Sequence, residues 1–380
     1  MKHSSDRILT THVGSLPRPQ NVVDMLFAED RGELLDRAAY DETMRRAVAD
    51  AVQRQREVGI DVVSDGEMSK ISYATYIRHR LTGFEPGEVP RATPKDLDAF
   101  PEYRDKLARQ GGTPQYQRPI CNGPIAVKSL APLEKDIQHL QAAAAASGVE
   151  ESFMNAASPG VIAVFQPNAY YPSHAAYLQA LAEAMKSEYE TIVGAGLLLQ
   201  VDCPDLAMGR HIKFRDASDD EFLTAAEQQI EALNYALSDV PADRVRMHVC
   251  WGNYEGPHVY DIPLVKIVDT VLRAKPQAIL FEASNPRHAH EWTVWNEARI
   301  PDDKILIPGV LDSTTNFVEH PELVAQRIQR FTDIVGRERV MAGTDCGFGT
   351  FAGFGAVHPS IAYAKLAALA EGAALASQRA

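Results

Sequence analysis

Short apolar runs that end in polar or glycine residues recur along the whole chain, and longer segments with helical periodicity lie between them. This alternation predicts a parallel β-sheet, because neighbouring parallel strands are joined by a crossover that is usually a helix. Eight repeats of the unit predict that the sheet closes into a (β/α)8 TIM barrel. The expected strands are residues 8–15, 61–67, 119–126, 197–202, 244–250, 278–282, 305–312 and 339–346.

The chain length of 380 residues fits one such barrel with loop insertions, so we expect residues 1–380 to form a single domain. Two segments are longer than a simple connection between a strand and a helix. Residues 91–117 are polar and contain several Pro and Gly, and residues 128–166 include an additional apolar run at 161–165. We interpret both segments as excursions from the barrel.

The formal net charge of −13 at pH 7 argues against nucleic acid and anionic membranes as partners. Residues 1–7 are largely polar and no apolar run is long enough to span a bilayer, which predicts neither a signal peptide nor a membrane span. We therefore expect a cytoplasmic protein, and a homo-oligomer is compatible with this sequence. The four cysteines are widely spaced, which favours metal binding or burial over disulfides. Cys121 and Cys203 are expected to serve packing only.

Polar side chains follow nearly all of the expected strands. In a barrel of this kind, catalytic side chains lie at the carboxyl ends of the strands. Acidic residues buried at strand ends are costly unless they bind something, so this pattern points to a site. The strand-end residues are Ser15, Asp65, Glu67, Asn122, Asp202, His248, Cys250, Glu282, Asp312, Asp345 and Cys346.

Four of these residues suit one tetrahedral zinc ion. His248 and Cys250 are two residues apart on an expected strand, so their side chains point to the same face. Imidazole and thiolate are ligands that zinc prefers, and Glu282 and Cys346 complete the set. Cys346 lies in the glycine-flanked turn GTDCGFG (343–349), where the backbone can approach a ligand closely. The alternatives are a buried structural thiol for Cys346 and a carboxylate paired with Arg or Lys for Glu282.

Asp312 is a further acid at the end of an expected strand. It is placed for proton transfer or for orienting a substrate. The equally favoured alternative is that its carboxylate caps the turn that follows the strand.

Taken in order, these residues resemble the catalytic barrel of the cobalamin-independent methionine synthase family. The barrel of epoxyalkane:coenzyme M transferase is similar. The resemblance rests on THVGSLP (11–17), SDGE (64–67), QVDCP (200–204) and the cysteine turn, and it covers essentially the whole chain. It implies a barrel of the methionine synthase and uroporphyrinogen decarboxylase type in which zinc converts a thiol into a thiolate nucleophile that accepts a methyl or alkyl group.

The resemblance also implies roles for individual residues. His248, Cys250, Glu282 and Cys346 fall on the zinc ligands of the family. Ser15, Glu67 and Asp202 fall on the positions that hold the amino acid part of homocysteine.

Elementary electrostatics supports such a substrate, independently of the resemblance. Two carboxylates that face one cavity repel each other unless a cation lies between them, so Glu67 and Asp202 suit an ammonium group. A salt bridge from a neighbouring Arg to these acids is the alternative.

The chain departs from the two-barrel methionine synthases in three ways. It lacks their long amino-terminal half. Leu130 lies near the place of the tryptophan that stacks on the folate pterin, and Thr314 lies roughly where a histidine follows the segment GVLD (309–312). These departures call methyltetrahydrofolate into question as the donor and leave the zinc and thiol chemistry unchanged.

The expected activity is methyl transfer to homocysteine, as by a 5-methyltetrahydropteroyltriglutamate–homocysteine S-methyltransferase. One alternative is alkyl transfer to another thiol such as coenzyme M, which would require an Arg to bind the sulfonate. A second alternative is a decarboxylase or a binding barrel without zinc on the same scaffold.

Several other polar residues have simpler interpretations. His258, His288 and His290 lie in loop or helix contexts, which favours surface or packing roles over metal ligation. Arg78 and Arg80 follow Glu67 in an expected loop, where a solvated position is favoured and binding of an anionic substrate tail is the alternative.

Overall fold

The computed structural model describes residues 1–33, 36–87, 93–109 and 118–379. Eight parallel strands form one sheet in the order β1-β10-β9-β8-β7-β6-β5-β2. The two edge strands meet, because the backbone N–H of Asp61 donates to the carbonyl of Thr10 over 3.1 Å. The predicted (β/α)8 barrel is therefore confirmed. Its strands are β1 Leu9–Thr10, β2 Val62–Ser64, β5 Glu151–Ala157, β6 Leu198–Asp202, β7 Val245–Val249, β8 Ala278–Glu282, β9 Ile305–Leu311 and β10 Met341–Thr344.

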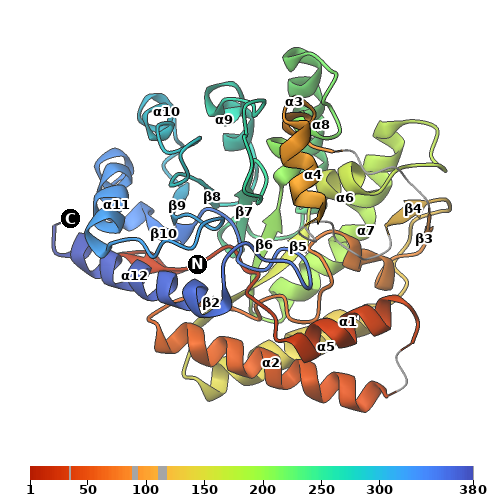
Figure 1. Ribbon diagram of the computed structural model, residues 1–380, viewed down its shortest axis with the longest axis horizontal. Helices are drawn as coiled ribbons and strands as arrows, with labels where there is room; N and C mark the ends of the chain where they lie inside the picture. The colour runs from red at the N-terminus through yellow and green to blue at the C-terminus, as the bar shows by residue number, and fades with distance from the viewer. Residues whose placement is uncertain (34–35, 88–92, 110–117, 380) are drawn as a thin grey trace.

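Helices surround the strands on the outside of the barrel (Figure 1). The chain enters most of them directly after a loop at the carboxyl end of a strand. The longer helices are α1 Gln20–Asp30, α2 Arg37–Glu57, α5 Ala131–Ala146, α7 His174–Gly194, α8 Asp219–Ala236, α9 Leu264–Leu272, α11 Pro321–Val335 and α12 Pro359–Ser377. Shorter helices are α6 Pro159–Phe165, α10 Trp292–Glu297 and the 3-10 turns η1 Thr75–His79, η2 Pro204–Leu206, η3 Met208–His211, η4 Ala242–Arg244 and η5 Arg337–Arg339.

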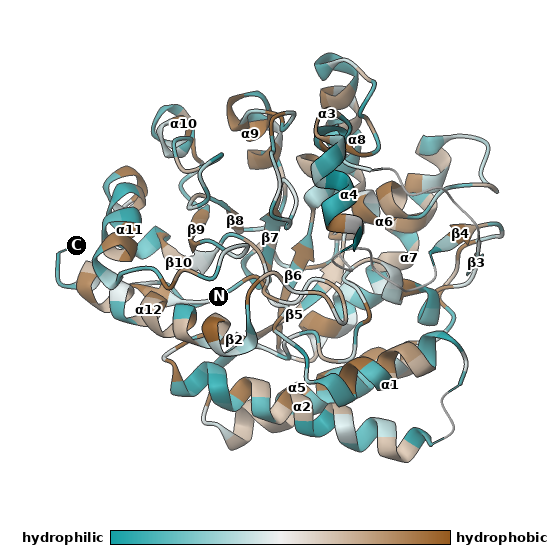
Figure 2. Cartoon of the chain, in the orientation of Figure 1, coloured by the Kyte–Doolittle hydropathy of each residue, from teal (hydrophilic) through white to brown (hydrophobic). Residues whose placement is uncertain are grey.

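The start of α8 illustrates how local sequence sets these elements. Ser218 accepts a hydrogen bond from the N–H of Glu221, and the Glu221 carboxylate accepts one from the N–H of Ser218. This capping box satisfies backbone donors that the first helical turn leaves free. Apolar residues of the helices pack on the strands, and Figure 2 shows hydrophilic residues along the outer side of α2.

The third barrel strand is not where the sequence predicted it. The segment 119–126 contributes only β4 (Pro119–Cys121), which pairs antiparallel with β3 (Phe84–Pro86) in a separate hairpin. The barrel position is taken by β5, which lies inside the segment 128–166 that we expected to be an excursion. Its sequence ESFMNAA contains no β-branched residue, so burial on both faces, not intrinsic propensity, makes it a strand. The other seven expected strands overlap barrel strands.

The remaining excursion is only partly described. Its described portion forms α3 (Lys95–Ala99) and α4 (Pro101–Arg109), while residues 91–92 and 110–117 lie outside the described residues. Among the described residues, no helix is long and apolar enough to cross a membrane.

The barrel interior is filled by side chains from nearly every strand, so the barrel is a closed core below its carboxyl end. Arg246 lies fully buried in this interior, with its guanidinium 4.0 Å from the centre of the Phe153 ring. It donates to the hydroxyl of Thr11 over 2.8 Å and to the carbonyl of His12 over 2.7 Å. These bonds satisfy a charge that would otherwise be costly to bury.

Candidate active site

The strands β7 and β10 bring two thiols and an imidazole together at the carboxyl end of the barrel. Cys250 Sγ lies 3.0 Å from Cys346 Sγ, and Cys346 Sγ lies 3.9 Å from His248 Nε2. All three ligand atoms lie within 4.8 Å of one another and the side chains are buried. His248 and Cys250 point to the same side because they are two residues apart at the end of β7.

Glu282, at the end of β8, lies beside this cluster. Its Oε1 is 3.7 Å from Cys346 Sγ and accepts the backbone N–H of Trp251 over 2.7 Å. Its Oε2 accepts the side-chain amide of Asn285 over 2.6 Å. Hydrogen bonds thus orient both Glu282 oxygens before any ligand binds. The four residues predicted as one ligand set are therefore neighbours at the carboxyl end of the barrel.

The thiols are strongly protonated when only protein groups surround them. A hydrogen bond from Cys346 lowers the pKa of Cys250, but burial and the nearby Glu282 carboxylate outweigh it and raise that pKa to about 11. Burial also raises the pKa of Cys346 well above its usual range. A divalent cation would reverse this balance, because coordinated thiols lose their protons. Two thiols, an imidazole and a carboxylate are a donor set that suits a borderline-soft metal ion.

The turn that carries Cys346 packs closely on the loop that follows β1. A Cβ atom at Gly347 would overlap the hydroxyl oxygen of Ser15 and lie 3.1 Å from its carbonyl oxygen, so glycine allows this close approach without displacing Ser15. The backbone N–H of Phe348 donates to the carbonyl of Ser15 over 2.8 Å, and Asn253 donates to the carbonyl of Gly347 over 2.7 Å. The glycine-flanked turn therefore brings Ser15 next to the cysteines.

A cavity of about 50 Å³, which we call the small cavity, lies against the cysteines. Its lining includes Ser15, Glu67 and Asp202, the three residues that the resemblance assigned to the amino acid part of homocysteine. The small cavity is lined by Val13, Ser15, Glu67, Tyr73, Asp202, Pro204, Met208, His248, Cys250, Asn253, Cys346, Gly347 and Thr350.

Glu67 reaches the small cavity from a left-handed backbone conformation, with φ at 55°. This unusual conformation for a non-glycine residue is held by Asp65, which accepts the Glu67 N–H over 2.9 Å, and by Arg18, which donates to the Glu67 carbonyl over 2.7 Å. The carboxylate atom Oε2 is buried and has no hydrogen-bond partner. Burial, with a contribution from the like charge of Asp202, raises the pKa of Glu67 to about 7.

Asp202 faces Glu67 from the end of β6. Its Oδ2 accepts the side-chain amide of Asn155 over 2.9 Å, and its Oδ1 accepts that of Gln200 over 3.0 Å. His248 Nδ1 lies 3.6 Å from Oδ1 of Asp202. The nearby Arg18 donates to the backbone carbonyl of Glu67, and within the described part of the chain no arginine forms a salt bridge with either carboxylate.

A second cavity, which we call the large cavity, measures about 250 Å³ and lies on the other side of Cys346. Asp312 and Thr314 line it together with Glu282, Asn285 and Asp345. Asp312 Oδ1 accepts the N–H of Thr314 over 3.0 Å and its hydroxyl over 2.8 Å, and Oδ2 accepts the hydroxyl of Thr315 over 2.5 Å. These three hydrogen bonds are the ones expected of a carboxylate that caps the turn after the strand, which was the alternative role for Asp312.

A model of the cobalamin-independent synthase catalytic domain matches residues 8–88 and 115–368. The chain belongs to the cobalamin-independent methionine synthase family. Two similar family members, both named methionine synthase, come from Saccharolobus islandicus and Saccharolobus solfataricus. They are 25% and 26% identical over 373 residues, and each comparison covers 96% of this chain and 93% of the relative.

Solved structures with a cobalamin-independent synthase description have the same fold. A B12-independent methionine synthase from Shewanella sp. W3-18-1, in complex with selenomethionine, gives a TM-score of 0.74 at 17% identity and covers 98% of both chains. A putative vitamin-B12 independent methionine synthase from Listeria monocytogenes gives a TM-score of 0.66 at 19% identity, over 97% of this chain and 98% of that one.

Sequence reasoning missed two asparagines that orient the acids of the candidate site, Asn155 beside Asp202 and Asn285 beside Glu282. The fold alone brings Asn155 to Asp202. The three-residue spacing between Glu282 and Asn285 was a signal that the two side chains could meet.

The expectation of a solvated loop was wrong for both Arg80 and Arg78. The Arg80 side chain is 3% exposed and forms ion pairs with Glu188 at 2.7 Å and Asp136 at 2.9 Å. The Arg78 side chain is 11% exposed and forms an ion pair with Asp30.

Proposed function

We propose that this protein is a zinc-dependent methyltransferase that methylates the thiol of homocysteine to form methionine. The observation that carries the proposal is the position of the Cys250–Cys346 pair at the wall of a cavity that also contains the unpaired carboxylate oxygen of Glu67. The metal at the cysteines would bind the substrate thiol, and the neighbouring Glu67 carboxylate would bind the α-ammonium group. The names of the family members support the same reaction.

The donor set fits zinc. His248, Cys250, Glu282 and Cys346 would supply one nitrogen, two sulfurs and one oxygen, and each of these ligand types binds zinc in proteins. When bound, zinc supplies a Lewis acid that deprotonates the substrate thiol and keeps it nucleophilic. Asn285 and the N–H of Trp251 hold the Glu282 carboxylate in its orientation. Such outer contacts typically change metal affinity 10- to 100-fold.

The small cavity fits the amino acid part of homocysteine. An ammonium group between Glu67 and Asp202 would relieve their repulsion and donate to the free Oε2 of Glu67. Ser15 would bind the substrate carboxylate through its hydroxyl. Val13, Tyr73 and Met208 provide apolar contacts for the methylene groups.

The large cavity is the proposed site of the methyl donor. The reaction forms the bond between sulfur and the methyl carbon and breaks the bond between that carbon and the donor, while the thiol proton is released. Asp312, which we predicted as a catalytic acid, lines this cavity, but its three accepted hydrogen bonds favour an ordering role for the loop at 312–315. Thr314, in place of a histidine, gives this donor side a different chemistry from that expected for the folate-dependent enzymes.

Alkyl transfer to coenzyme M fits the small cavity less well. A sulfonate requires a cationic partner, and the residues that the structure describes as lining this cavity include two carboxylates and no Lys or Arg. A decarboxylase without zinc would have no use for the paired thiols.

X-ray absorption at the zinc edge tests the proposal without knowledge of the donor. Addition of homocysteine should raise the number of sulfur ligands from two to three. Methionine formation from 5-methyltetrahydrofolate, as the monoglutamate and the triglutamate, then tests the donor. Unchanged sulfur coordination at saturating homocysteine would contradict the proposal.

A further inference from the structure

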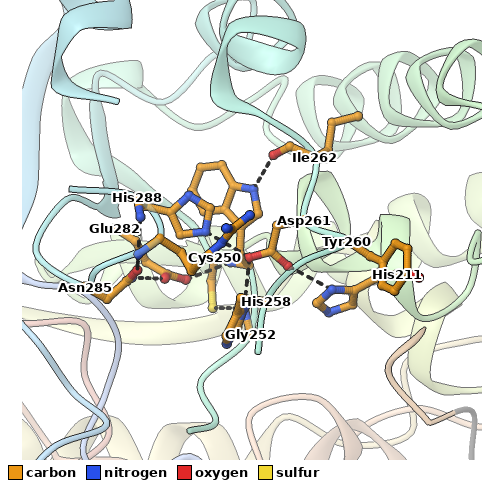
Figure 3. A network of polar contacts seen from close by, with 12 residues as sticks. His211, Cys250, Gly252, His258, Tyr260, Asp261, Ile262, Glu282, Asn285 and His288 are labelled. Atoms are coloured by element: carbon orange, nitrogen blue, oxygen red, sulfur yellow. Dashed lines mark hydrogen bonds and ion pairs between the residues drawn. The ribbon is translucent and has the colours of Figure 1, made fainter. Parts of the chain in front are cut away.

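Three histidines from three different loops surround one buried carboxylate, behind the candidate active site. His211 lies in η3, His258 and Asp261 lie in the loop between β7 and α9, and His288 lies in the loop after β8. Figure 3 shows the histidines gathered around Asp261, next to Cys250 and Glu282. His258 Nδ1 is 2.8 Å from Asp261 Oδ2, and His288 Nε2 is 2.9 Å from the same oxygen. The ligand atoms of His258, Asp261 and His288 all lie within 4.8 Å of one another.

The outer ring nitrogens of two of these histidines have the partners that metal-bound histidines normally have. His288 Nδ1 lies 2.8 Å from the carboxylate of Glu291, and His258 Nε2 lies 3.1 Å from the carbonyl of Tyr254. A histidine that binds a metal usually donates its other N–H to a carboxylate or a backbone carbonyl, which fixes the tautomer. With a metal bound, the inner nitrogens, which now lie within hydrogen-bond distance of Asp261, would act as the ligands.

His211 contacts the other oxygen of the same carboxylate. His211 Nδ1 lies 2.9 Å from Asp261 Oδ1, which is an ion pair when the ring is protonated, although the orientation does not meet hydrogen-bond geometry. The side chains are 1% and 2% exposed, and His211 Nε2 is buried without a hydrogen-bond partner among the described residues. Buried polar atoms without good hydrogen bonds are costly, and a cation bound at Asp261 would offset part of that cost.

A hydrogen-bonded imidazolium is the alternative for His288. Burial lowers the pKa of His288, but bonds to Asp261 and Glu291 raise it to about 10. That alternative accounts for His288 and does not account for the buried His211 Nε2, which has no hydrogen-bond partner among the described residues. Asp96 is also close, but its Oδ1 accepts the N–H of Tyr260 over 3.0 Å and its Oδ2 the hydroxyl of Tyr254 over 2.6 Å, so it is not needed as a ligand.

We propose that His258, Asp261 and His288 form a second metal site, distinct from the cysteine centre, for a divalent first-row transition ion such as zinc. Two imidazoles and one carboxylate are ligands that suit such an ion and leave a coordination position open. The site joins two loops at the carboxyl end of the barrel, and His211 contacts the other oxygen of Asp261 from a third segment. The His288 ring stacks on Trp251 at 4.3 Å, and the backbone N–H of Trp251 donates to Glu282, so the second ion would stiffen the support of the first.

The metal content of the purified holoprotein tests this proposal. We expect two equivalents of divalent metal per chain by mass spectrometry. In a Cys250→Ser/Cys346→Ser variant one equivalent should remain, and X-ray absorption should detect only nitrogen and oxygen ligands around it. His258→Gln should lose one equivalent and retain the sulfur-ligated ion, which cobalt substitution reports through sulfur-to-metal charge-transfer absorption.

His290→Ala is the matched control, because His290 is an exposed histidine in the same loop as His288. It should retain both equivalents. One equivalent in the native protein that is bound through sulfur and is unaffected by His258→Gln would overturn the second site and leave the proposed function intact. One equivalent without sulfur ligands would instead contradict the cysteine centre alone.

Discussion

Cys250 and Cys346 are 96 positions apart in the chain, and their sulfur atoms lie 3.0 Å from each other at the ends of β7 and β10. No disulfide joins them, and both thiols are buried. Two thiols at this separation, with His248 and Glu282 beside them, form half of a tetrahedral ligand set.

Substitution of Cys250 or Cys346 by Ser should remove one equivalent of zinc and abolish methyl transfer, because the donor set loses a sulfur. The far-ultraviolet circular dichroism spectrum should be unchanged, since neither side chain fills the barrel interior. Cys121→Ala, at a buried thiol in the β3–β4 hairpin, is the control and should retain both the metal and activity. Full zinc occupancy in both Ser variants would contradict the assignment.

Asn285→Ala should weaken zinc binding by about 10- to 100-fold, because Glu282 Oε2 loses the amide that orients it over 2.6 Å. Competition with a chromophoric chelator measures the change. Arg287→Ala, two residues away and exposed, serves as the control for a general effect on this loop. Equal affinities in the native protein and the Asn285 variant would show that Glu282 does not depend on this contact.

Homocysteine should bind on the order of 100-fold more tightly than its des-amino analogue. The ammonium group would make two charge-assisted hydrogen bonds with Glu67 and Asp202, each worth roughly 1.5–3 kcal/mol, and each 1.4 kcal/mol corresponds to about tenfold in affinity. Asp202→Asn should remove most of this discrimination while the zinc content stays constant. Isothermal calorimetry decides the point, and equal affinities for the two thiols in the native protein would favour an acceptor without an amino group.

Acid should destabilise the barrel through His12. Its Nε2 lies 2.7 Å from Gln55 Oε1 and its Nδ1 accepts the N–H of Gly14, so only the neutral ring fits. Burial lowers the pKa of His12 to about 4. The unfolded chain, with a pKa near 6.5, therefore binds a proton at a higher pH than the folded protein does. The stability from His12 is complete above about pH 6.5 and is lost as the pH falls towards 4.

At pH 5 this loss amounts to about 2 kcal/mol relative to pH 7.5. Urea unfolding of the native protein and of His12→Asn at the two pH values measures it. The variant should show a smaller difference between the two pH values, because the group that titrates is gone. Parallel pH dependence of the two proteins would assign the acid sensitivity to other groups.

The barrel and the main site could be predicted because both depend on short local patterns. His248 and Cys250 lie on one face of a strand wherever that strand is placed, and strand ends meet at one edge of a barrel. The strand β5 could not be predicted, because residues 151–157 contain no β-branched residue and only tertiary burial selects them, whereas the segment 119–126 offers Ile120 and Ile125 between residues that disfavour a long strand.

The network around Asp261 was missed for a different reason. His211, Asp261 and His288 lie in three loops, and no sequence periodicity relates the geometry of one loop to that of another. His258 and His288 were interpreted as surface or packing residues, and the structure buries both of them. That interpretation gave no sign that the two rings share a carboxylate.

The small and large cavities have only Asn253 and Cys346 in common among their described lining residues. If the proposed function holds, the thiol and the methyl donor would have separate cavities that meet at Cys346, so neither would have to leave before the other arrives. We therefore expect steady-state kinetics through a ternary complex, with double-reciprocal plots that intersect. Parallel plots would instead indicate that the two substrates bind in turn.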